Sequence, residues 1–263
     1  MLVLIRGAGD IATGVAMRLW HSHIKVVMTD IAKPTCIRRT VAFSDAIYRG
    51  KATVEGVTAV YAASVEEALA AVERGEIPVL VDPEGSCRHE LKPDAVVDAI
   101  LAKKNLGTKI TDAPIVIGVG PGFTAKEDCH AVIETIRGHY MGRVIWEGAA
   151  APNTNIPGFI GGFSGERILR APCDGIFTQI HEIGDMVEEG DICGTVNGEP
   201  MRCTIGGVVR GILPDGTPVY KGMKSGDVDP RGDITYCGFV SDKALAVGGG
   251  VLEAILSLTG ALR

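Results

Sequence analysis

The sequence predicts an α/β domain with a parallel sheet, followed by a small all-β module and a C-terminal helix. Three observations support this prediction. An apolar run over residues 2–6 leads directly into a glycine-rich turn and a helical pattern. Apolar runs then alternate with helical patterns as far as residue 141, which is typical of a parallel sheet. Beyond residue 168 a glycine and valine pattern repeats at a fixed offset, which is typical of a small β module.

Composition places the chain among globular proteins. It has 263 residues, 46% hydrophobic and 22% charged, which is enough for a substantial core and one or two domains. The formal net charge of −6 and the lack of a basic stripe argue against nucleic acid and anionic membranes as partners. Because Met1 leads directly into a predicted strand, we expect neither an export leader nor a membrane anchor, and hence a cytoplasmic protein.

The cysteines indicate neither a disulfide framework nor a metal site. There are seven, widely spaced, at positions 36, 87, 129, 173, 193, 203 and 237, and none forms a Cys-x-x-Cys pair. No Ser/His/Asp order and no pair of acids suggests a hydrolase. We therefore expect mostly free thiols, no metal ion and no hydrolytic centre.

The turn after the first strand has the pattern of a dinucleotide-binding site. Gly7 permits a tight turn, and Gly9 lets the backbone approach a diphosphate that the following helix N-terminus would face. Asp30 ends the next apolar run, where a contact to a ribose hydroxyl is expected. The predicted binding residues are Gly7, Gly9, Asp10, Ile11, Ala12 and Asp30. The alternative is that the glycines only turn the chain.

Further elements follow in order along the first domain. We expect strands over residues 24–29, 54–60, 77–81 and 115–119, and helices over residues 10–22, 34–49, 64–74, 92–102 and 124–137. Ser64 with Glu67, and Thr124 with Glu127, have the spacing of a capping box. These alternating units predict a Rossmann-like nucleotide-binding domain over residues 1–141.

A change of composition marks the end of this domain. Residues 142–167 are rich in Gly, Pro, Ala and Asn and are predicted to form a connector. In the module over residues 168–232, Gly175 recurs 32 residues later as Gly207. This module resembles the biotinyl and lipoyl carriers, whose fold is the barrel-sandwich hybrid, but it has no lysine at the hairpin between its halves. Residues 233–263 form a C-terminal segment whose helix is expected to be interrupted by three consecutive glycines.

A second group of candidate residues follows the second predicted strand. Cys36 is expected in the first turn of the helix over residues 34–49, next to Arg38 and Arg39. A helix N-terminus and neighbouring guanidinium groups lower a thiol pKa, so Cys36 is a candidate carrier of sulfur or selenium. Alternatively, Cys36 is buried and the two arginines hold a phosphate or solvate the helix. The sequence leaves both interpretations open.

Two further loops are expected at the same edge of the sheet, where parallel sheets bind their ligands. The loop after residue 81 places Cys87 beside an arginine and a histidine, either as a weaker candidate thiol or as an ordinary exposed turn. Gly118, Gly120 and Gly122 follow a buried strand, where backbone N–H groups could bind a second anionic group. Close packing is the alternative explanation for these glycines.

Four segments of the chain resemble the accessory proteins of selenium-dependent molybdenum hydroxylases, the YqeB family. They are residues 7–14 (GAGDIATG), 32–44 (AKPTCIRRTVAFS), 118–130 (GVGPGFTAKEDCH) and 134–139 (ETIRGH). The likeness extends over nearly the whole chain, and the family is distantly similar to xanthine dehydrogenase accessory factors. The resemblance implies a role in maturing the molybdenum cofactor, by handling molybdopterin cytosine dinucleotide, a related nucleotide, or its labile selenium or sulfur.

The resemblance also implies partners. They are a molybdenum hydroxylase apoenzyme and the small-molecule nucleotide cofactor, and the chain could also form a homo-oligomer. Two other functions stay open. One is an NAD(P)-dependent oxidoreductase in which Asp30 reads the ribose, and the other is a nucleotide-binding module without catalysis. The sequence does not decide whether the chain is an enzyme.

Overall fold

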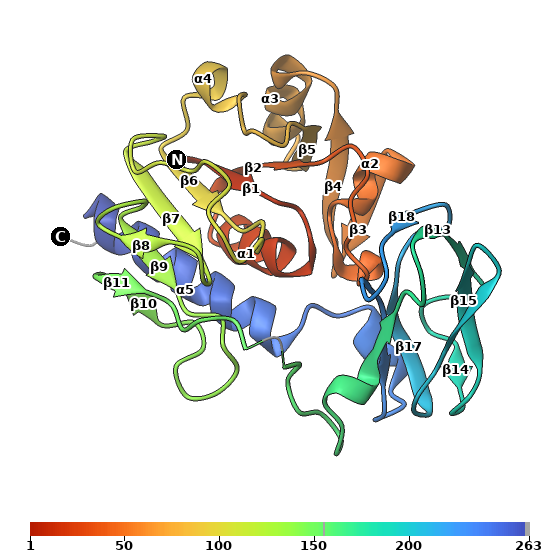
Figure 1. The fold of residues 1–263 in the computed structure, drawn as a ribbon. Coiled ribbons are helices and arrows are strands. Elements are labelled where there is room, and N and C mark those ends of the chain that lie inside the picture. The colour runs from red at the N-terminus through yellow and green to blue at the C-terminus, as the bar shows by residue number, and fades with distance from the viewer. Residues whose placement is uncertain (155, 261–263) are drawn as a thin grey trace. The chain divides into compact units, whose positions relative to one another are not determined.

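The computed structural model describes residues 1–154 and 156–260, which divide into two units (Figure 1). Unit 1 contains residues 1–34, residues 42–153 and the chain from residue 240 onwards, and unit 2 contains residues 35–41 and 154–239. Each unit is therefore built from separate stretches of the chain. Residue 155 of the predicted connector and residues 261–263 of the predicted C-terminal segment lie outside the described residues.

In the described part of the chain, unit 1 is built on a nine-stranded sheet in the order β10-β9-β7-β6-β1-β2-β5-β4-β3. The strands are β1 (Leu2–Arg6), β2 (Lys25–Asp30), β3 (Lys51–Val54), β4 (Val57–Ala62), β5 (Ile77–Val81), β6 (Ala95–Asp98), β7 (Ile115–Val119), β9 (Ala131–Ile133) and β10 (Val144–Ile145). The inner strands pair in parallel, whereas β3 and β10 pair antiparallel at the two edges. A separate small sheet joins β8 (Thr124–Ala125) to β11 (Gly148–Ala149).

Helices of very different length accompany this sheet. They are α1 (Asp10–His21), α2 (Asp45–Arg49), α3 (Val65–Glu73), α4 (Arg88–Leu91) and α5 (Asp242–Thr259). The capping box predicted for α3 is confirmed: the N–H of Glu67 donates to the Ser64 hydroxyl at 3.2 Å, and the N–H of Ala63 donates to the Glu67 carboxylate at 2.8 Å.

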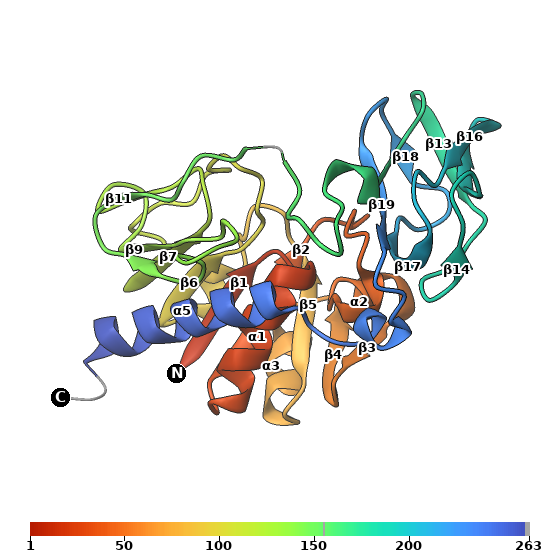
Figure 2. The same cartoon turned by 90° about the horizontal axis from the view of Figure 1, so that it is seen from below.

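α5 continues through the glycines at which the sequence predicts an interruption. A Cβ added at Gly248 would lie 2.7 Å from the Gly14 oxygen of α1, and one added at Gly250 would lie 2.1 Å from the Gly142 oxygen. These glycines let α5 approach α1 and the turn at residue 142 backbone to backbone (Figure 2). The predicted interruption is wrong because this packing outweighs the poor helix propensity of glycine.

The predicted Rossmann-like domain is wrong. Within the described residues, the ranges expected as helices over 92–102 and 124–137 hold β6, β8 and β9 instead. β5 also lies between β2 and β4, whereas a doubly wound dinucleotide-binding sheet places its third strand directly beside the second. Unit 1 is instead a mixed sheet with antiparallel strands at both edges.

Local sequence explains why these two helices do not form. Pro93 precedes Val96 and Val97, and β-branched side chains that are buried on both faces of a sheet favour a strand. In the second range the Asp128 carboxylate accepts a hydrogen bond from the N–H of Thr124 at 2.8 Å and closes a turn. The apolar residues that follow then enter the sheet as β9.

Unit 2 forms two four-stranded antiparallel sheets in the residues described. One contains β12 (Ile168–Arg170), β19 (Lys224–Asp229), β17 (Gly207–Ile212) and β14 (Met186–Val187), and the other contains β16 (Glu199–Arg202), β15 (Ile192–Val196), β13 (Gly175–Gln179) and β18 (Pro218–Val219). β13, β14 and β15 begin at residues 175, 186 and 192, and β17, β18 and β19 begin at residues 207, 218 and 224. The sequence repeat is therefore a repeat of strands.

The predicted barrel-sandwich hybrid is also corrected by this topology. β12 and β16 lie outside the repeat, and each adds to the end of a sheet by pairing with β19 and β15, respectively. The result is two distinct four-stranded sheets whose buried core includes Leu169, Phe177 and Ile212. The short helices of unit 2 are η1 (Arg39–Val41), η2 (Gly165–Arg167) and η3 (Ile234–Cys237).

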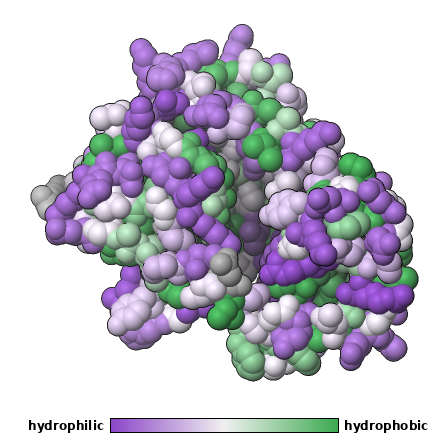
Figure 3. Space-filling model, in the orientation of Figure 1, coloured by the Kyte–Doolittle hydropathy of each residue, from purple (hydrophilic) through white to green (hydrophobic). Residues whose placement is uncertain are grey.

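The surface is mixed in polarity. On the face drawn in Figure 3, hydrophilic side chains predominate and hydrophobic ones form small groups between them. Among the helices of the described residues, none combines the length and the apolar character needed to cross a membrane.

Candidate functional site

The turn after β1 requires glycine for reasons of backbone geometry. Gly7 has a φ of +96°, which L side chains rarely adopt, and its N–H donates to the Thr29 oxygen at 2.8 Å. A Cβ at this position would lie 2.9 Å from the Ala99 oxygen just beyond β6. Gly7 therefore fits between the backbone of β2 and the backbone just after β6, the two strands that flank β1.

α1 begins directly after this turn, at the carboxyl ends of β1 and β2. Gly9 is its N-cap residue, and no side chain makes a capping hydrogen bond there. A helix N-terminus carries partial positive charge and offers N–H groups to an anion. Asp10 lies in the first turn, whereas Ile11 and Ala12 are buried against the rest of unit 1.

Asp30, at the end of β2, braces the turn. Its two carboxylate oxygens accept hydrogen bonds from the N–H groups of Ala8 and Ile31, both at 2.8 Å. Burial raises the pKa of Asp30, although these hydrogen bonds act in the opposite direction. The side chain that the sequence predicts as a ribose contact is thus engaged with the backbone of the glycine turn.

A second stretch of chain holds the same turn from its other side. The N–H of Ser44 donates to the Ala8 oxygen at 2.8 Å, and the N–H of Phe43 donates to the Thr13 hydroxyl of α1 at 2.9 Å. Phe43 and Ser44 are both buried. The start of α1 is therefore preorganised by hydrogen bonds from two directions.

A buried polar cluster lies beside the turn and was not predicted. Arg6, the last residue of β1, donates to the Thr108 hydroxyl and lies 3.4 Å from an Asp98 oxygen at the end of β6. It also donates to the Pro83 oxygen at 3.1 Å. Burial raises the pKa of Asp98, while Thr108 and the Arg6 charge lower it. A charged residue at the end of each of two apolar strands was the signal that could have identified this cluster.

The loop after β5 joins that cluster through Asp82. The Asp82 carboxylate accepts the N–H of Cys87 at 2.7 Å. Burial acts to raise the pKa of Asp82, but hydrogen bonds from the backbone and thiol of Cys87 and the charge of Arg6 lower it overall. Burial, and then the bond to Asp82, raises the pKa of the Cys87 thiol to about 12. Cys87 is therefore a protonated hydrogen-bond donor at neutral pH.

The three glycines predicted to bind a second anionic group are surrounded by protein atoms: Gly118 lies in β7, and Gly120 and Gly122 lie in the turn after it. A Cβ at Gly118 would lie 2.5 Å from the Phe123 ring, and one at Gly122 would lie 2.6 Å from the Lys104 backbone. The N–H of Gly120 donates to the Ile133 oxygen at 2.9 Å. Each of the three glycines thus takes part in packing or backbone pairing within unit 1.

Cys36, Arg38 and Arg39 belong to unit 2. The helix expected over residues 34–49 is wrong: its described residues contain only η1 and α2, and Cys36 lies in an irregular segment before them. Arg39 donates to the Ile212 oxygen at 3.0 Å, and Arg38 donates to the Tyr236 and Phe239 oxygens at 3.0 and 3.1 Å. Tertiary hydrogen bonds to unit 2 therefore replace the helix here.

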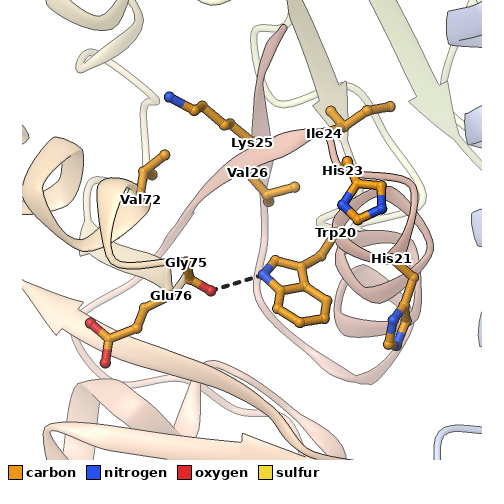
Figure 4. Close-up of a pocket in the computed structure, with 9 residues that line it drawn as sticks. All are labelled: Trp20, His21, His23, Ile24, Lys25, Val26, Val72, Gly75 and Glu76. Atoms are coloured by element: carbon orange, nitrogen blue, oxygen red, sulfur yellow. Dashed lines mark hydrogen bonds between the residues drawn. The ribbon is translucent and has the colours of Figure 1, made fainter.

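One pocket of unit 1 lies at the opposite, amino-terminal ends of the strands. Its volume is about 300 Å³. It is lined by Trp20, His21, His23, Ile24, Lys25, Val26, Val72, Gly75 and Glu76 (Figure 4). The Trp20 indole N–H donates to the Gly75 oxygen at 2.9 Å. Parallel sheets bind ligands at the other edge, so we assign no ligand to this pocket.

In the residues that the structure describes, no three His, Cys, Asp or Glu side chains are grouped as metal ligands.

Two thiols meet in unit 2, where Cys193 and Cys203 are buried with their sulfur atoms 2.8 Å apart. The hydrogen bond between them raises the pKa of Cys193 and lowers that of Cys203. Neither thiol was singled out from the sequence.

Comparison with known proteins identifies one close relative. No family model matches the chain. Over 257 residues, 98% of this chain, it is 54% identical to the uncharacterized protein YqeB of Escherichia coli strain K12. This identity supports the YqeB family label. The chain spans 48% of that relative's length.

Solved structures give much weaker likenesses. A succinylglutamate desuccinylase from a Silicibacter species is 12% identical, and the match covers 86% of this chain and 84% of that chain with a TM-score of 0.25. An aspartoacylase family protein from Mesorhizobium loti is also 12% identical, with 86% and 83% covered and a TM-score of 0.27. TM-scores this low carry no conclusion about this chain.

These findings correct the expected classification. The labels Rossmann and barrel-sandwich hybrid are wrong, because unit 1 has a mixed sheet of different strand order and unit 2 has two separate antiparallel sheets. The names of the relative and of the similar structures give no support to the expected link with molybdenum and selenium. That link rests on the sequence resemblance alone.

Proposed function

We propose that this chain is an accessory protein that acts in the cytoplasm in the maturation of a selenium-dependent molybdenum hydroxylase. In this proposal unit 1 binds the nucleotide part of molybdopterin cytosine dinucleotide or of a related cofactor, and the partner is the hydroxylase apoenzyme. Four segments that resemble this accessory family support the role, and one of them is the glycine turn itself. The identity to YqeB is consistent with it, although that relative is uncharacterized.

The position of the α1 N-terminus carries the binding part of the proposal. It follows Gly9 without a capping side chain and lies at the carboxyl ends of parallel strands. Ligands of open parallel sheets bind at this edge, and a helix N-terminus favours a diphosphate. The same geometry occurs here on a mixed sheet, because it needs only a strand, a glycine turn and a helix.

Asp30 has a positioning role in this proposal. Both of its carboxylate oxygens accept backbone N–H groups, one of them from Ala8 in the turn itself. Removing the carboxylate would free that N–H and loosen the turn, so the effect on a ligand would be indirect. We assign no covalent step to Cys87, because its thiol is protonated at neutral pH.

Titration calorimetry with cytidine diphosphate tests the binding site. Gly9 has a φ of −70°, which any residue adopts, so Gly9→Ala is compatible with the backbone. We expect the wild type to bind, and Gly9→Ala to weaken binding about tenfold or more because a methyl group obstructs close approach of the diphosphate. Gly249→Ala, at an open position of α5, is the matched control and should bind as the wild type does.

The outcomes separate the competing functions. No binding of cytidine diphosphate, or equal binding by Gly9→Ala and the wild type, would contradict the proposed site. Saturable binding of NAD(P)H with hydride transfer would favour the oxidoreductase instead. The maturation role has its own test, in which the molybdenum and selenium contents of a co-expressed hydroxylase are measured with and without this protein. Equal contents would contradict that role.

A further inference from the structure

Two cysteines of unit 2 meet at an irregular strand pair. β15 pairs with β16, and the register shifts between Ile192 and Gly194. Cys193 is the extra residue of β15 at that shift, and Cys203 directly follows the last residue of β16. A β-bulge redirects a side chain and is often a designed feature. Here the bulge lies at the residue whose thiol contacts Cys203.

The contact between these two thiols differs from those of other cysteines in the chain. The sulfur atoms of Cys193 and Cys203 are 2.8 Å apart. In contrast, the thiols of Cys129, Cys173 and Cys237 donate to backbone oxygens at distances between 3.4 and 3.9 Å. In the described part of the chain, no third His, Cys, Asp or Glu side chain joins the pair as a metal ligand. The chemistry available to the pair is therefore that of a dithiol.

Both thiols are buried, but they lie at the edge of a sheet. Cys193 is fully buried and Cys203 is 2% exposed. Among the described strands β16 pairs with β15 alone, and Arg202 and Thr204 on either side of Cys203 are exposed. Segments with few partners open locally at a lower free-energy cost than the core does. We therefore expect a small solute to reach Cys203 when β16 opens.

The hydrogen bond between the thiols makes them chemically unequal. It lowers the pKa of Cys203, although burial acts in the opposite direction. The same bond raises the pKa of Cys193, and burial raises it further. Because the thiolate is the nucleophile in thiol oxidation, Cys203 is the first to react. Cys193 is then the resolving thiol beside it, which is the arrangement of redox-sensing cysteines.

We propose that Cys193 and Cys203 form a reversible disulfide that locks β16 onto β15 when the protein meets a peroxide. The Cys203 thiolate attacks one peroxide oxygen, the O–O bond breaks, and the hydroxide that leaves takes up the proton lost by Cys203 to become water. The Cys193 thiol then attacks the sulfur of the resulting sulfenic acid. The S–O bond breaks, and the thiol proton leaves with the hydroxide as a second water. One hydrogen peroxide is thus reduced to two waters while two thiols are oxidised to a disulfide.

The position of the pair explains why the bond would act as a lock. Asn197 and Gly198 form the turn between β15 and β16, and the two cysteines lie at the other, open end of this hairpin. There the N–H of Cys203 donates to the Asp191 oxygen and the N–H of Gly190 donates to the Cys203 oxygen, both at 2.8 Å. A covalent link at this end keeps the edge strand in place. A low-molecular-weight thiol reverses it by thiol–disulfide exchange, as is typical of transient disulfides in reducing compartments.

Peptide mass spectrometry of the full chain treated with hydrogen peroxide tests the bond. Trypsin cuts after Arg202, so Cys193 and Cys203 fall in separate peptides that only a disulfide holds together. We expect the joined peptides, two hydrogen atoms lighter than their sum, to form at least tenfold faster than Cys129 is oxidised, because burial raises the pKa of the Cys129 thiol to about 11. Dithiothreitol should separate the peptides again.

Two alanine variants identify the partner of Cys203. Cys173 lies in the same tryptic peptide as Cys193 and packs against the same core, so Cys173→Ala is the matched control and should give the joined peptides as the wild type does. Cys193→Ala should give none and should leave Cys203 as a sulfenic acid that dimedone traps. Joined peptides that persist in Cys193→Ala would overturn the proposal. If that variant does not fold, fragmentation of the joined wild-type peptides locates the bond, and a bond at Cys173 would overturn it equally.

Hydrogen exchange measures the lock itself. After peroxide treatment, the backbone amides of β16 should exchange about tenfold more slowly, and dithiothreitol should restore the original rate. Equal exchange before and after the disulfide forms would show that the bond does not hold the edge strand. These experiments contain no nucleotide, so their failure and the failure of the proposed nucleotide site are distinguishable.

Discussion

Two glycine-rich turns lie at the carboxyl ends of β1 and β7 and look alike in the sequence. In the turn after β1, Gly7 fits between two backbones, and Gly9 opens an uncapped helix. In the turn after β7, the Phe123 ring and the Lys104 backbone occupy the space that glycine leaves. The comparison teaches that glycine spacing predicts a tight approach to the backbone, but does not reveal whether a ligand or the protein itself makes that approach.

The same distinction applies to the acids beside the turns. Asp30 accepts the N–H of Ala8 in the first turn, and Asp128 accepts the N–H of Thr124 just after the second. Both carboxylates brace backbone in this structure. An acid at the expected distance from a glycine turn is therefore weak evidence for a ribose contact, because bracing requires the same residue at the same place.

Alkylation of Cys87 gives the largest expected effect, and it tests whether the loop after β5 is an open, reactive turn. With a pKa of about 12 instead of 9.0, its thiolate fraction at pH 8 falls about a thousandfold. Iodoacetamide labelling followed by peptide mass spectrometry should show Cys87 reacting at least that much more slowly in the folded chain than in urea. Similar rates in both states would mean that burial and the hydrogen bond to Asp82 do not keep the Cys87 thiol protonated.

Gly118→Ala tests the packed turn. Its Cβ would lie 2.5 Å from the Phe123 ring, within a buried strand, so overpacking should lower the free energy of unfolding by about 3 kcal/mol. Urea denaturation measures this value. Gly56→Ala is the control for the substitution, since no atom lies within 4 Å of its Cβ and only the positive φ is strained. A cost at Gly118 no larger than at Gly56 would remove the contrast between the two turns.

Asp30→Asn tests the braced turn, with an expected loss of about 2 kcal/mol because one of the two N–H bonds loses its acceptor. Burial raises the pKa of Asp30 above 3.8, so the stability contributed by this group is fully present below pH 3.8 and is lost as the pH rises through the folded-state pKa. The cost of Asp30→Asn should therefore be larger at pH 4 than at pH 7. A cost that increases with pH would contradict this assignment.

Gly249→Ala has the smallest expected effect and the opposite sign. No atom lies within 4 Å of its Cβ, so alanine should stabilise α5 by about 1 kcal/mol through its higher helix propensity. A Cβ added at the adjacent Gly250 would lie 2.1 Å from the Gly142 oxygen, so Gly250 should not tolerate the same change. Thermal unfolding of the two variants checks the pair, and equal effects would show that neighbouring atoms do not decide the role of these glycines.

Several features could be predicted from the sequence because they depend on neighbours along the chain. The apolar run and glycine turn at the start became β1, the turn and α1, and the capping box of Ser64 became the start of α3. The offset of 32 residues between Gly175 and Gly207 became a repeat of strands in unit 2. The first two signals are local in the sequence, and within each half of the repeat the turns and strands also follow from nearby residues, so these features depend little on the rest of the fold.

Tertiary structure decided the remainder. The sheet order of unit 1, the strand at residues 95–98 and the membership of residues 35–41 in unit 2 all depend on partners distant in the chain. The pairing of Arg210 with Asp229 depends on them as well. Pairing with a distant strand or carbonyl contributes more free energy than the helix propensity of a few residues, so a local pattern cannot foresee it. The sequence by itself therefore determined the turn after β1 and the starts of α1 and α3, and only the tertiary structure decided which other segments become strands and which side chains meet.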